Sequence, residues 1–149
     1  MNGLFRKVSI GLAATGLVDS LYLTWVKFTG KYALCGPIGD CESVNSSIYS
    51  EVYGIPIALL GALAYLIILL LLLLEGNIIF GRENARLAVF GISLVGVIYS
   101  IYLTYIEVIV LKAICPYCVL SAIILVILFL LSTVRVTRGE GLPREGYLL

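Results

Sequence analysis

Long apolar stretches separated by short polar segments dominate the pattern of this chain. Four stretches lie near residues 5–28, 55–75, 86–111 and 115–136. A helix needs about 20 apolar residues to cross the hydrocarbon core of a bilayer, and each stretch has that length. The pattern predicts an all-α fold, in which residues 1–149 form one domain, an integral membrane bundle of four transmembrane helices.

The first stretch has a second interpretation, a cleaved signal peptide, because Arg6 and Lys7 precede it. The apolar run of a signal peptide is about 7–15 residues long, but this one continues to Trp25. We therefore expect a retained helix.

The composition agrees with a membrane protein, since 61% of the residues are hydrophobic and the mean hydropathy is +1.10. The net charge of +1, without a basic cluster, gives no indication of nucleic-acid binding. Histidine, the commonest acid–base and metal-binding side chain, does not occur.

Basic residues concentrate at one end of the predicted bundle. Of the ten lysines and arginines, those at the termini and in the middle turn are Arg6, Lys7, Arg82, Arg86, Arg135, Arg138 and Arg144, and those at the opposite end are Lys27, Lys31 and Lys112. Basic residues are enriched on the cytoplasmic side of membranes. Both termini are therefore predicted to be cytoplasmic, in the cell membrane, and the two cysteine-bearing loops extracytoplasmic, where disulfides persist.

The longest predicted loop, residues 29–54, contains Cys35 and Cys41. Loops of this length are often functional. Within it, residues 43–50 are predicted to form a short helix that lies over the membrane as a lid, with Ser46 or Ser47 facing inward.

Smaller features complete the predicted outline. Pro56 fits the first turn of the second long helix, where its missing N–H is not needed. Gly76, Asn77 and Gly81 predict a cytoplasmic turn, and residues 137–149 a cytoplasmic tail.

The first and third stretches share a pattern at an offset of 80 residues, which aligns residues 16–25 with 96–105 and pairs Cys35 with Cys115. The two helices are expected to run in the same direction, so a parallel pseudo-repeat is one explanation. Chance is the other, because aromatic residues gather at membrane interfaces whatever the function.

The motif Cys115-Pro116-Tyr117-Cys118, at the start of the fourth stretch, carries the strongest chemical signal. Two thiols at this spacing can close a small disulfide ring, and the unsatisfied N–H groups of a helix start favour a thiolate. Two alternatives stay open. The pair could be inert and buried, like small apolar residues, or the four cysteines could bind zinc, although the spacing of Cys35 and Cys41 is wide for such a site.

This order of parts resembles the vitamin K epoxide reductase family, as a small prokaryotic homologue without a fused thioredoxin-like domain. The resemblance covers nearly the whole chain and rests on the loop with Cys35 and Cys41, on segments 41–47 and 54–56, and on the motif at 115–118. The bacterial disulfide-bond protein B family also has four helices and two outer cysteine pairs. It carries its closely spaced pair in the first outer loop, whereas this chain has it in the second.

The resemblance implies a function for each cysteine. Cys118 would be the thiolate facing a quinone, with Cys115 as its partner. Cys41 would pair with Cys115, and Cys35 would exchange with an extracytoplasmic thioredoxin-like protein. That partner is expected to be a separate protein, because the C-terminal tail is too short for a fused domain. Ser47 would lie near the quinone head group, unless it only caps a helix.

A lipid-dissolved quinone such as menaquinone or ubiquinone is also the acceptor that a helical bundle could most readily bind between its helices. Small residues would let the helices approach each other: Gly61, Ala62, Ala64, Gly91 and Gly96. Tyrosines could contact the edge of the quinone ring: Tyr99, Tyr102 and Tyr105. Ordinary packing is the alternative for all of them.

Two predicted quinone-binding positions depart from vertebrate members of the family. Counting from Gly54, Ser50 stands where those members have an asparagine. Four residues beyond Cys118, Ala122 stands where they have a tyrosine. One polar contact is shortened and the other is missing. We therefore expect oxidation of thiols by a simple quinone, with vitamin K epoxide reduction as the alternative.

Two acidic residues lie within predicted helices, where ionisable groups are costly and indicate function. Asp19 is predicted to relay protons or to form a structural hydrogen bond. Glu107 is predicted to reach water at the outer boundary by snorkelling.

The sequence thus predicts a membrane thiol:quinone oxidoreductase that generates disulfides, with no metal. The rivals are a non-enzymatic membrane protein with structural disulfides or a four-cysteine zinc site, and a transporter built around Asp19.

Overall fold

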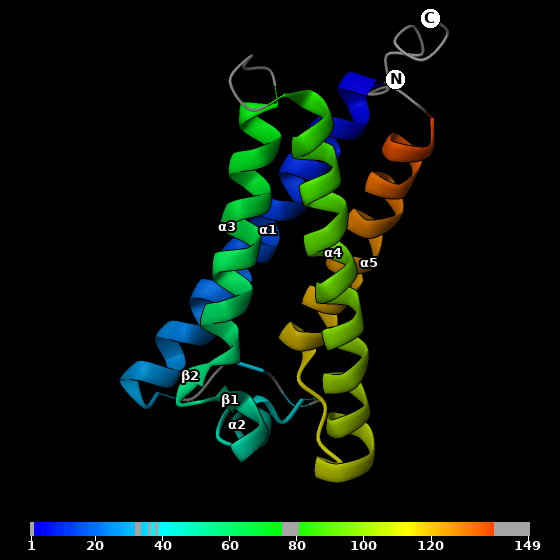
Figure 1. Ribbon diagram of the computed structural model, residues 1–149. Helices are drawn as coiled ribbons and strands as arrows, with labels where there is room; N and C mark the ends of the chain where they lie inside the picture. Colours follow the sequence, from blue (N-terminus) through cyan, green and yellow to red (C-terminus); the bar gives the residue numbers. More distant parts are fainter. Residues whose placement is uncertain (1, 32–33, 36, 38, 76–80, 139–149) are drawn as a thin grey trace, which may run out of the picture.

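The computed structural model describes residues 2–31, 34–35, 37, 39–75 and 81–138. Its long helices are α1 (Asn2–Thr29), α3 (Ile57–Leu74), α4 (Arg82–Tyr105) and α5 (Pro116–Thr137), and a π-helix, η3 (Ile106–Leu111), continues α4 (Figure 1). Four candidate membrane spans, the third of which includes η3, are long and apolar enough to cross a bilayer. This confirms the predicted class, a multi-pass helical membrane protein.

The helix bounds lie within a few residues of those predicted. When η3 is counted with α4, the largest difference is at the start of α4, which begins at Arg82 rather than near residue 86. Apolar patterning marks only the part of a helix that meets lipid, and polar residues continue the helix beyond it. The predicted turn around Gly76 and Asn77, and the tail from residue 139, lie outside the described residues.

The long helices form a ring in which α1 and α4 each pack against α3 and α5. As expected for the first and third of four alternating spans, α1 and α4 run in the same direction, and α3 and α5 run in the opposite one (Figure 1). The start of α1 and the end of α5 therefore lie at one end of the bundle. The segments that bear the cysteines lie at the other.

Two buried clusters hold the ring together. One joins α1, α3 and α4 through Ala13, Ile68, Leu72 and Val89. The other joins α3 and α5 through Tyr65, Ile124 and Leu128. Many large apolar side chains on the outer faces remain exposed, as expected for surfaces that contact lipid.

The lid differs in detail from the single helix predicted over residues 43–50. It consists of helix α2 (Cys41–Asn45) and a 3-10 turn, η2 (Ile48–Ser50). Helix α2 begins early because Asp40 caps it, accepting a hydrogen bond from the Ser43 N–H at 3.1 Å.

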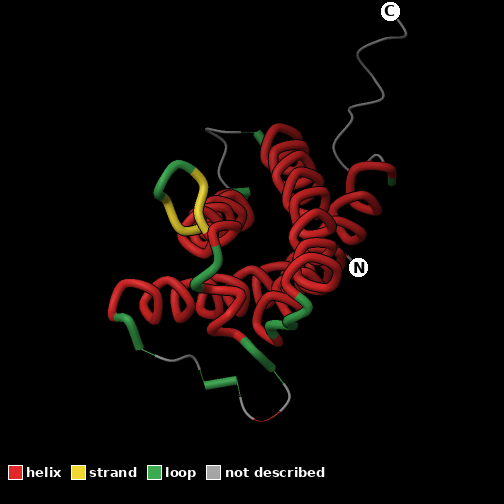
Figure 2. Tube along the Cα trace, turned by 90° about the horizontal axis from the view of Figure 1, so that it is seen from below, coloured by secondary structure: helices red, strands yellow, loops and turns green. Residues whose placement is uncertain are grey.

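A two-stranded antiparallel ribbon, which the pattern did not predict, follows the lid. Strands β1 (Glu51–Val52) and β2 (Ile55–Pro56) pair across a turn in which Tyr53 and Gly54 have positive φ angles. Figure 2 shows the ribbon (yellow) at the start of α3. Strands of two residues leave no periodic signal in a sequence. Pro56 lies in β2, directly before α3, and not in the first helical turn.

At the opposite end of the bundle, a buried ion cluster ties the four long helices together. The Glu75 carboxylate accepts hydrogen bonds from Arg86 at 2.8 Å and from Arg135 at 2.6 Å. Arg6 donates to the Leu72 carbonyl at 2.9 Å, near the end of α3. Arginines that the sequence indicated only as markers of orientation thus also join the helix ends.

Candidate active site

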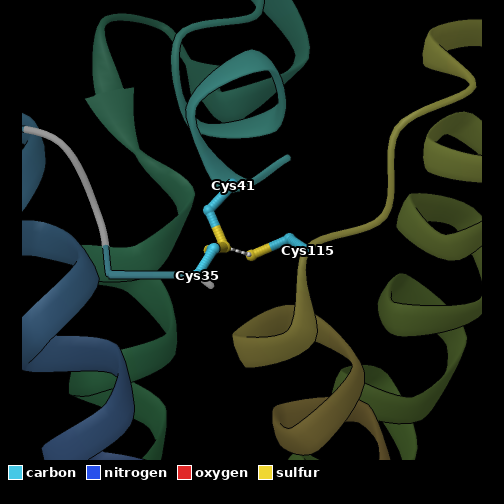
Figure 3. Close-up of side chains that lie close together, drawn as sticks. All are labelled: Cys35, Cys41 and Cys115. Atoms are coloured by element: carbon cyan, nitrogen blue, oxygen red, sulfur yellow. Dashed lines mark hydrogen bonds between the residues drawn. A yellow bond between two sulfur atoms is a disulfide. The ribbon is translucent and has the colours of Figure 1, made fainter. Parts of the chain in front are cut away.

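Cysteines from both loops meet at the lid end of the bundle (Figure 3). Cys35 and Cys41 form a disulfide, whereas Cys115 and Cys118 are free. The Cys115 Sγ lies 3.4 Å from the Cys41 Sγ. Both of these residues are 1% exposed, so exchange between their sulfur atoms would be shielded from water.

Two hydrogen bonds hold the segment around Cys35 and Cys41 against the start of α5. The Asp40 N–H donates to the Ile114 carbonyl at 3.0 Å. The Tyr117 hydroxyl donates to the Leu34 carbonyl at 2.7 Å. The two segments are far apart in the sequence, and these hydrogen bonds fix the approach of the lid disulfide to Cys115.

Cys115 occupies the N-cap position of α5, where unsatisfied N–H groups favour negative charge. A hydrogen bond from the Cys118 thiol lowers the pKa of Cys115 below its usual value. Burial opposes this shift, and the backbone N–H groups of Cys118 and Tyr117 add to it. In this redox state, Cys115 is therefore the favoured thiolate of the pair.

A central cavity of about 530 Å³ lies between the long helices and the lid, beside Cys115 and Cys118. Its volume falls within the usual range for small-molecule sites, roughly 300–1,000 Å³. Its wall includes five of the residues predicted to contact the quinone, together with the predicted proton relay: Ser47, Ser50, Gly61, Tyr99, Ala122 and Asp19.

Other residues considered for the quinone site are divided between this wall and other surfaces. Ala64, Gly91 and Gly96 line the cavity. Tyr102 and Tyr105 do not, and they are 51% and 59% exposed. The interpretation of these two tyrosines as ring contacts is therefore wrong, because they point to the outer face of α4.

The hydroxyl groups of the lid serines are engaged within the lid itself. Ser47 Oγ donates to the Val44 carbonyl at 2.7 Å, and Ser50 Oγ donates to the Asn45 carbonyl at 2.7 Å. Ser46 is exposed, so Ser47 is the one of the two predicted serines that faces the cavity.

Lys27 fastens the lid to α1. Its Nζ donates to the Asn45 carbonyl at 2.7 Å and to Ser50 Oγ, and it pairs with the Glu51 carboxylate at 3.1 Å. The side chain is only 15% exposed. Lys27, which the sequence indicated only as a basic residue at this end of the bundle, thus joins the lid to α1.

Both acidic residues singled out in the sequence line the cavity. Asp19 is 7% exposed, and its Oδ2 has no hydrogen-bond partner within the part of the chain that the structure describes. Glu107 is 5% exposed, so the prediction that it snorkels to water is wrong. It lies in η3, where the wider π-helical turn alters which side chains face inward, and regular helical spacing gives no sign of this.

Comparison with known proteins agrees with this arrangement. The family model described as "Vitamin K epoxide reductase family" matches residues 7–133. The chain belongs to the vitamin K epoxide reductase family. This confirms the resemblance inferred from the cysteine spacing and the order of the helices.

Within the vitamin K epoxide reductase family, one curated relative is "Thiol-disulfide oxidoreductase LTO1" of Arabidopsis thaliana. It is 39% identical over 131 residues, which cover 83% of this chain and 35% of LTO1. This family member therefore spans about a third of the length of that relative.

Three of the cysteines lie close enough together to be considered as metal ligands in this member of the vitamin K epoxide reductase family. The sulfur atoms of Cys35, Cys41 and Cys115 lie within 4.8 Å of one another. Metals bind cysteine as the thiolate, and two of these sulfur atoms are joined in a disulfide. The geometry thus suits disulfide exchange directly, whereas a metal would first require reduction of that bond.

Proposed function

We propose that this protein is a membrane thiol:quinone oxidoreductase that generates disulfides. The observation that carries the proposal is the contact between Cys115 Sγ and the lid disulfide at 3.4 Å, beside a cavity of ligand size. Thiol–disulfide exchange needs a thiolate, a disulfide within reach and a leaving thiol. Family membership and the similarity to LTO1 support the same chemistry.

Electrons would pass from an extracytoplasmic thioredoxin-like dithiol protein to the lid. Its two thiols reduce the bond between Cys35 and Cys41, and the partner leaves as a disulfide. The Cys41 thiolate then attacks Cys115, which breaks the bond between Cys115 and Cys118. Attack of Cys35 on Cys41 restores the lid disulfide and leaves both thiols of the second pair reduced. The described structure, with a lid disulfide and two free thiols, corresponds to this last state.

A quinone in the central cavity would oxidise the reduced pair. The two thiols lose two electrons and two protons and form a disulfide, and the quinone becomes a hydroquinone. Ser47, Ser50, Gly61, Tyr99 and Ala122 would line its site.

The departures at Ser50 and Ala122 support thiol oxidation over reduction of vitamin K epoxide. The Ser50 hydroxyl is already engaged by Asn45 and Lys27, and Ala122 offers no polar group to the cavity. A simple quinone that accepts electrons needs fewer fixed polar contacts than an epoxide that must be positioned for ring opening.

Two cysteine variants test the electron path. Cys118→Ala in the pre-reduced protein should lose quinone reduction, because Cys115 cannot close its disulfide. Cys35→Ala should still reduce one equivalent of quinone in a single turnover but should lose transfer from a reduced thioredoxin-like protein. The measurement is quinone absorbance after mixing, with a thiol count before and after. Unchanged turnover in Cys118→Ala would contradict the proposal.

A further inference from the structure

We infer that Glu107 is the group that exchanges protons with the Cys115–Cys118 pair. The inference rests on the proposed function, since it concerns the oxidation and reduction of that pair. It assigns the principal proton exchange at sulfur to Glu107, whereas the sequence indicated Asp19 as the proton relay.

The π-helix η3 holds Glu107 against the start of α5. Its main-chain carbonyl accepts a hydrogen bond from the Ala113 N–H at 3.0 Å, and its Oε2 accepts one from the Cys115 N–H at 3.4 Å. Between these contacts the chain reverses through Lys112, which has a φ of 52°. Single turns of π-helix are frequently found at functional sites, and this one directs a carboxyl group toward the cysteine motif.

Glu107 shares the cavity wall with both thiols of the pair. Its Oε2 accepts from the Cys115 N–H at the start of α5, and Cys118 lies in the first turn of the same helix. The other titratable groups on the cavity wall are Asp19, Tyr49, Tyr65, Tyr99 and Cys115, and neither lysine nor arginine occurs among the described lining residues. Placing an acid in a membrane helix without a cation is costly. A chemical role at the neighbouring sulfur atoms accounts for its presence.

The proton balance of the exchange step gives Glu107 its first task. When the Cys41 thiolate attacks Cys115, a bond between Cys41 and Cys115 forms and the bond between Cys115 and Cys118 breaks. Cys118 leaves as a thiolate, and protonated Glu107 supplies its proton. A leaving thiolate in a buried site is stabilised by such a donor.

The oxidation step requires the reverse transfer. Glu107, now a carboxylate, takes the proton from the Cys118 thiol, and the electron pair of the thiolate becomes available as the disulfide with Cys115 forms. The quinone gains two electrons, and the two thiol protons end on its two oxygen atoms. Glu107 passes the Cys118 proton on to the quinone and is then a carboxylate. The proton that Cys41 releases on becoming a thiolate in the next cycle restores the protonated acid, so that thiols and quinone account for all protons and electrons.

The substitution Glu107→Gln tests this role. Glutamine keeps the shape and the acceptor for the Cys115 N–H but cannot accept the proton. The pre-reduced variant, mixed with decylubiquinone in a single turnover, should be slowed about 100-fold at neutral pH, within the range of general acid–base catalysis. Its rate should also rise more steeply with pH than that of the wild type, because the thiolate must then form with hydroxide. Glu107→Asp should recover part of the rate.

A matched control is Glu42→Gln, at an exposed acid on the lid, which should leave rate and pH profile unchanged. A Glu107→Gln variant with the rate and pH profile of the wild type, measured where Cys118→Ala is inactive, would overturn the inference and leave the proposed function intact. Slowing without a changed pH profile, and no recovery with aspartate, would reduce Glu107 to a structural role and also overturn it. Activity in Cys118→Ala would overturn both.

Discussion

At the scale of single residues, buried charges in this protein have identifiable partners, and Asp19 differs from the rest. Glu75 accepts hydrogen bonds from two arginines, Lys27 pairs with Glu51, and Glu107 accepts the Cys115 N–H. Within the described residues, one carboxylate oxygen of Asp19 has no partner. Because an unpartnered buried acid is destabilising, its place in the cavity wall is consistent with contact to a ligand or a proton.

The ion cluster around Glu75 leads to a prediction about stability. Its side chain is 6% exposed, and Glu75→Gln would remove the buried carboxylate charge with which both Arg86 and Arg135 pair. Removing one partner of a buried ion pair costs about 3 kcal/mol or more. We expect a clear fall in the melting temperature of the purified protein in detergent. Glu83→Gln, at an exposed acid near the same end, should have little effect, and equal stability of the two variants would argue against the cluster.

The same cluster predicts a dependence of stability on pH. Burial raises the pKa of Glu75, but hydrogen bonds from Arg135 and Arg86 outweigh burial and hold it below its usual value of 4.5. A lowered folded-state pKa contributes stability above the unfolded-state value and loses it as the pH falls through the folded-state value. The wild type should therefore lose more stability than Glu75→Gln in acid below pH 4.5, as thermal melts across acidic pH would show. Parallel curves would contradict this.

At the scale of elements, irregular turns place the chemistry. The π-helix η3 turns Glu107 inward. The N-cap at Asp40 makes Cys41, which forms the lid disulfide, the first residue of α2. Long regular helices provide the frame, because their hydrogen bonds are satisfied internally in lipid. The departures from regularity lie at the ends that carry cysteines.

Close packing of α1 on α3 depends on Gly16. A Cβ at this position would overlap the ring of Tyr65, which is 1% exposed and donates from its hydroxyl to the Ser121 carbonyl at 3.0 Å. We expect Gly16→Ala to destabilise the protein by about 1–3 kcal/mol, as overpacking does. Gly11→Ala, where nothing lies within 4 Å of the added atom, should be neutral or slightly stabilising. Thermal unfolding of both variants measures the difference, and a Gly16→Ala protein as stable as Gly11→Ala would disprove the contact.

At the scale of the whole molecule, α1 and α4 face each other across the cavity. Residues related by the 80-residue offset line its wall in pairs: Asp19 with Tyr99, Ser20 with Ser100, and Leu23 with Leu103. Each helix packs against α3 and α5. Similar faces on two helices that run in the same direction therefore enclose the proposed ligand site from opposite sides.

The orientation proposed from the basic residues can be tested on intact cells. In a chain whose four cysteines are replaced by serine, Lys31→Cys at the lid end should react with a membrane-impermeant maleimide added outside. Arg138→Cys, at the end of α5, should react only after permeabilisation. Both positions are exposed. The reverse pattern would place the cysteine site in the cytoplasm.

The sequence by itself determined the number of spanning helices, the end of the bundle that bears the cysteines, and which residues are proposed to react. These properties depend on the length of apolar runs, on local charge and on spacing within a motif, all of which are read along the chain. The candidate residues Asp19, Ser47, Ser50, Gly61, Tyr99 and Ala122 were also named from the sequence, and the structure brings them to one cavity.

Only the tertiary structure decided which groups meet. The 3.4 Å contact of Cys41 with Cys115, the ion cluster at Glu75 and the inward position of Glu107 each join segments that are distant in the sequence or lie in an irregular turn. Tyr102 and Tyr105, which lie on the same helix as Tyr99 and are the same residue type, face outward. Periodicity shows that a face is apolar but not which neighbour covers it, because packing of the four helices sets that.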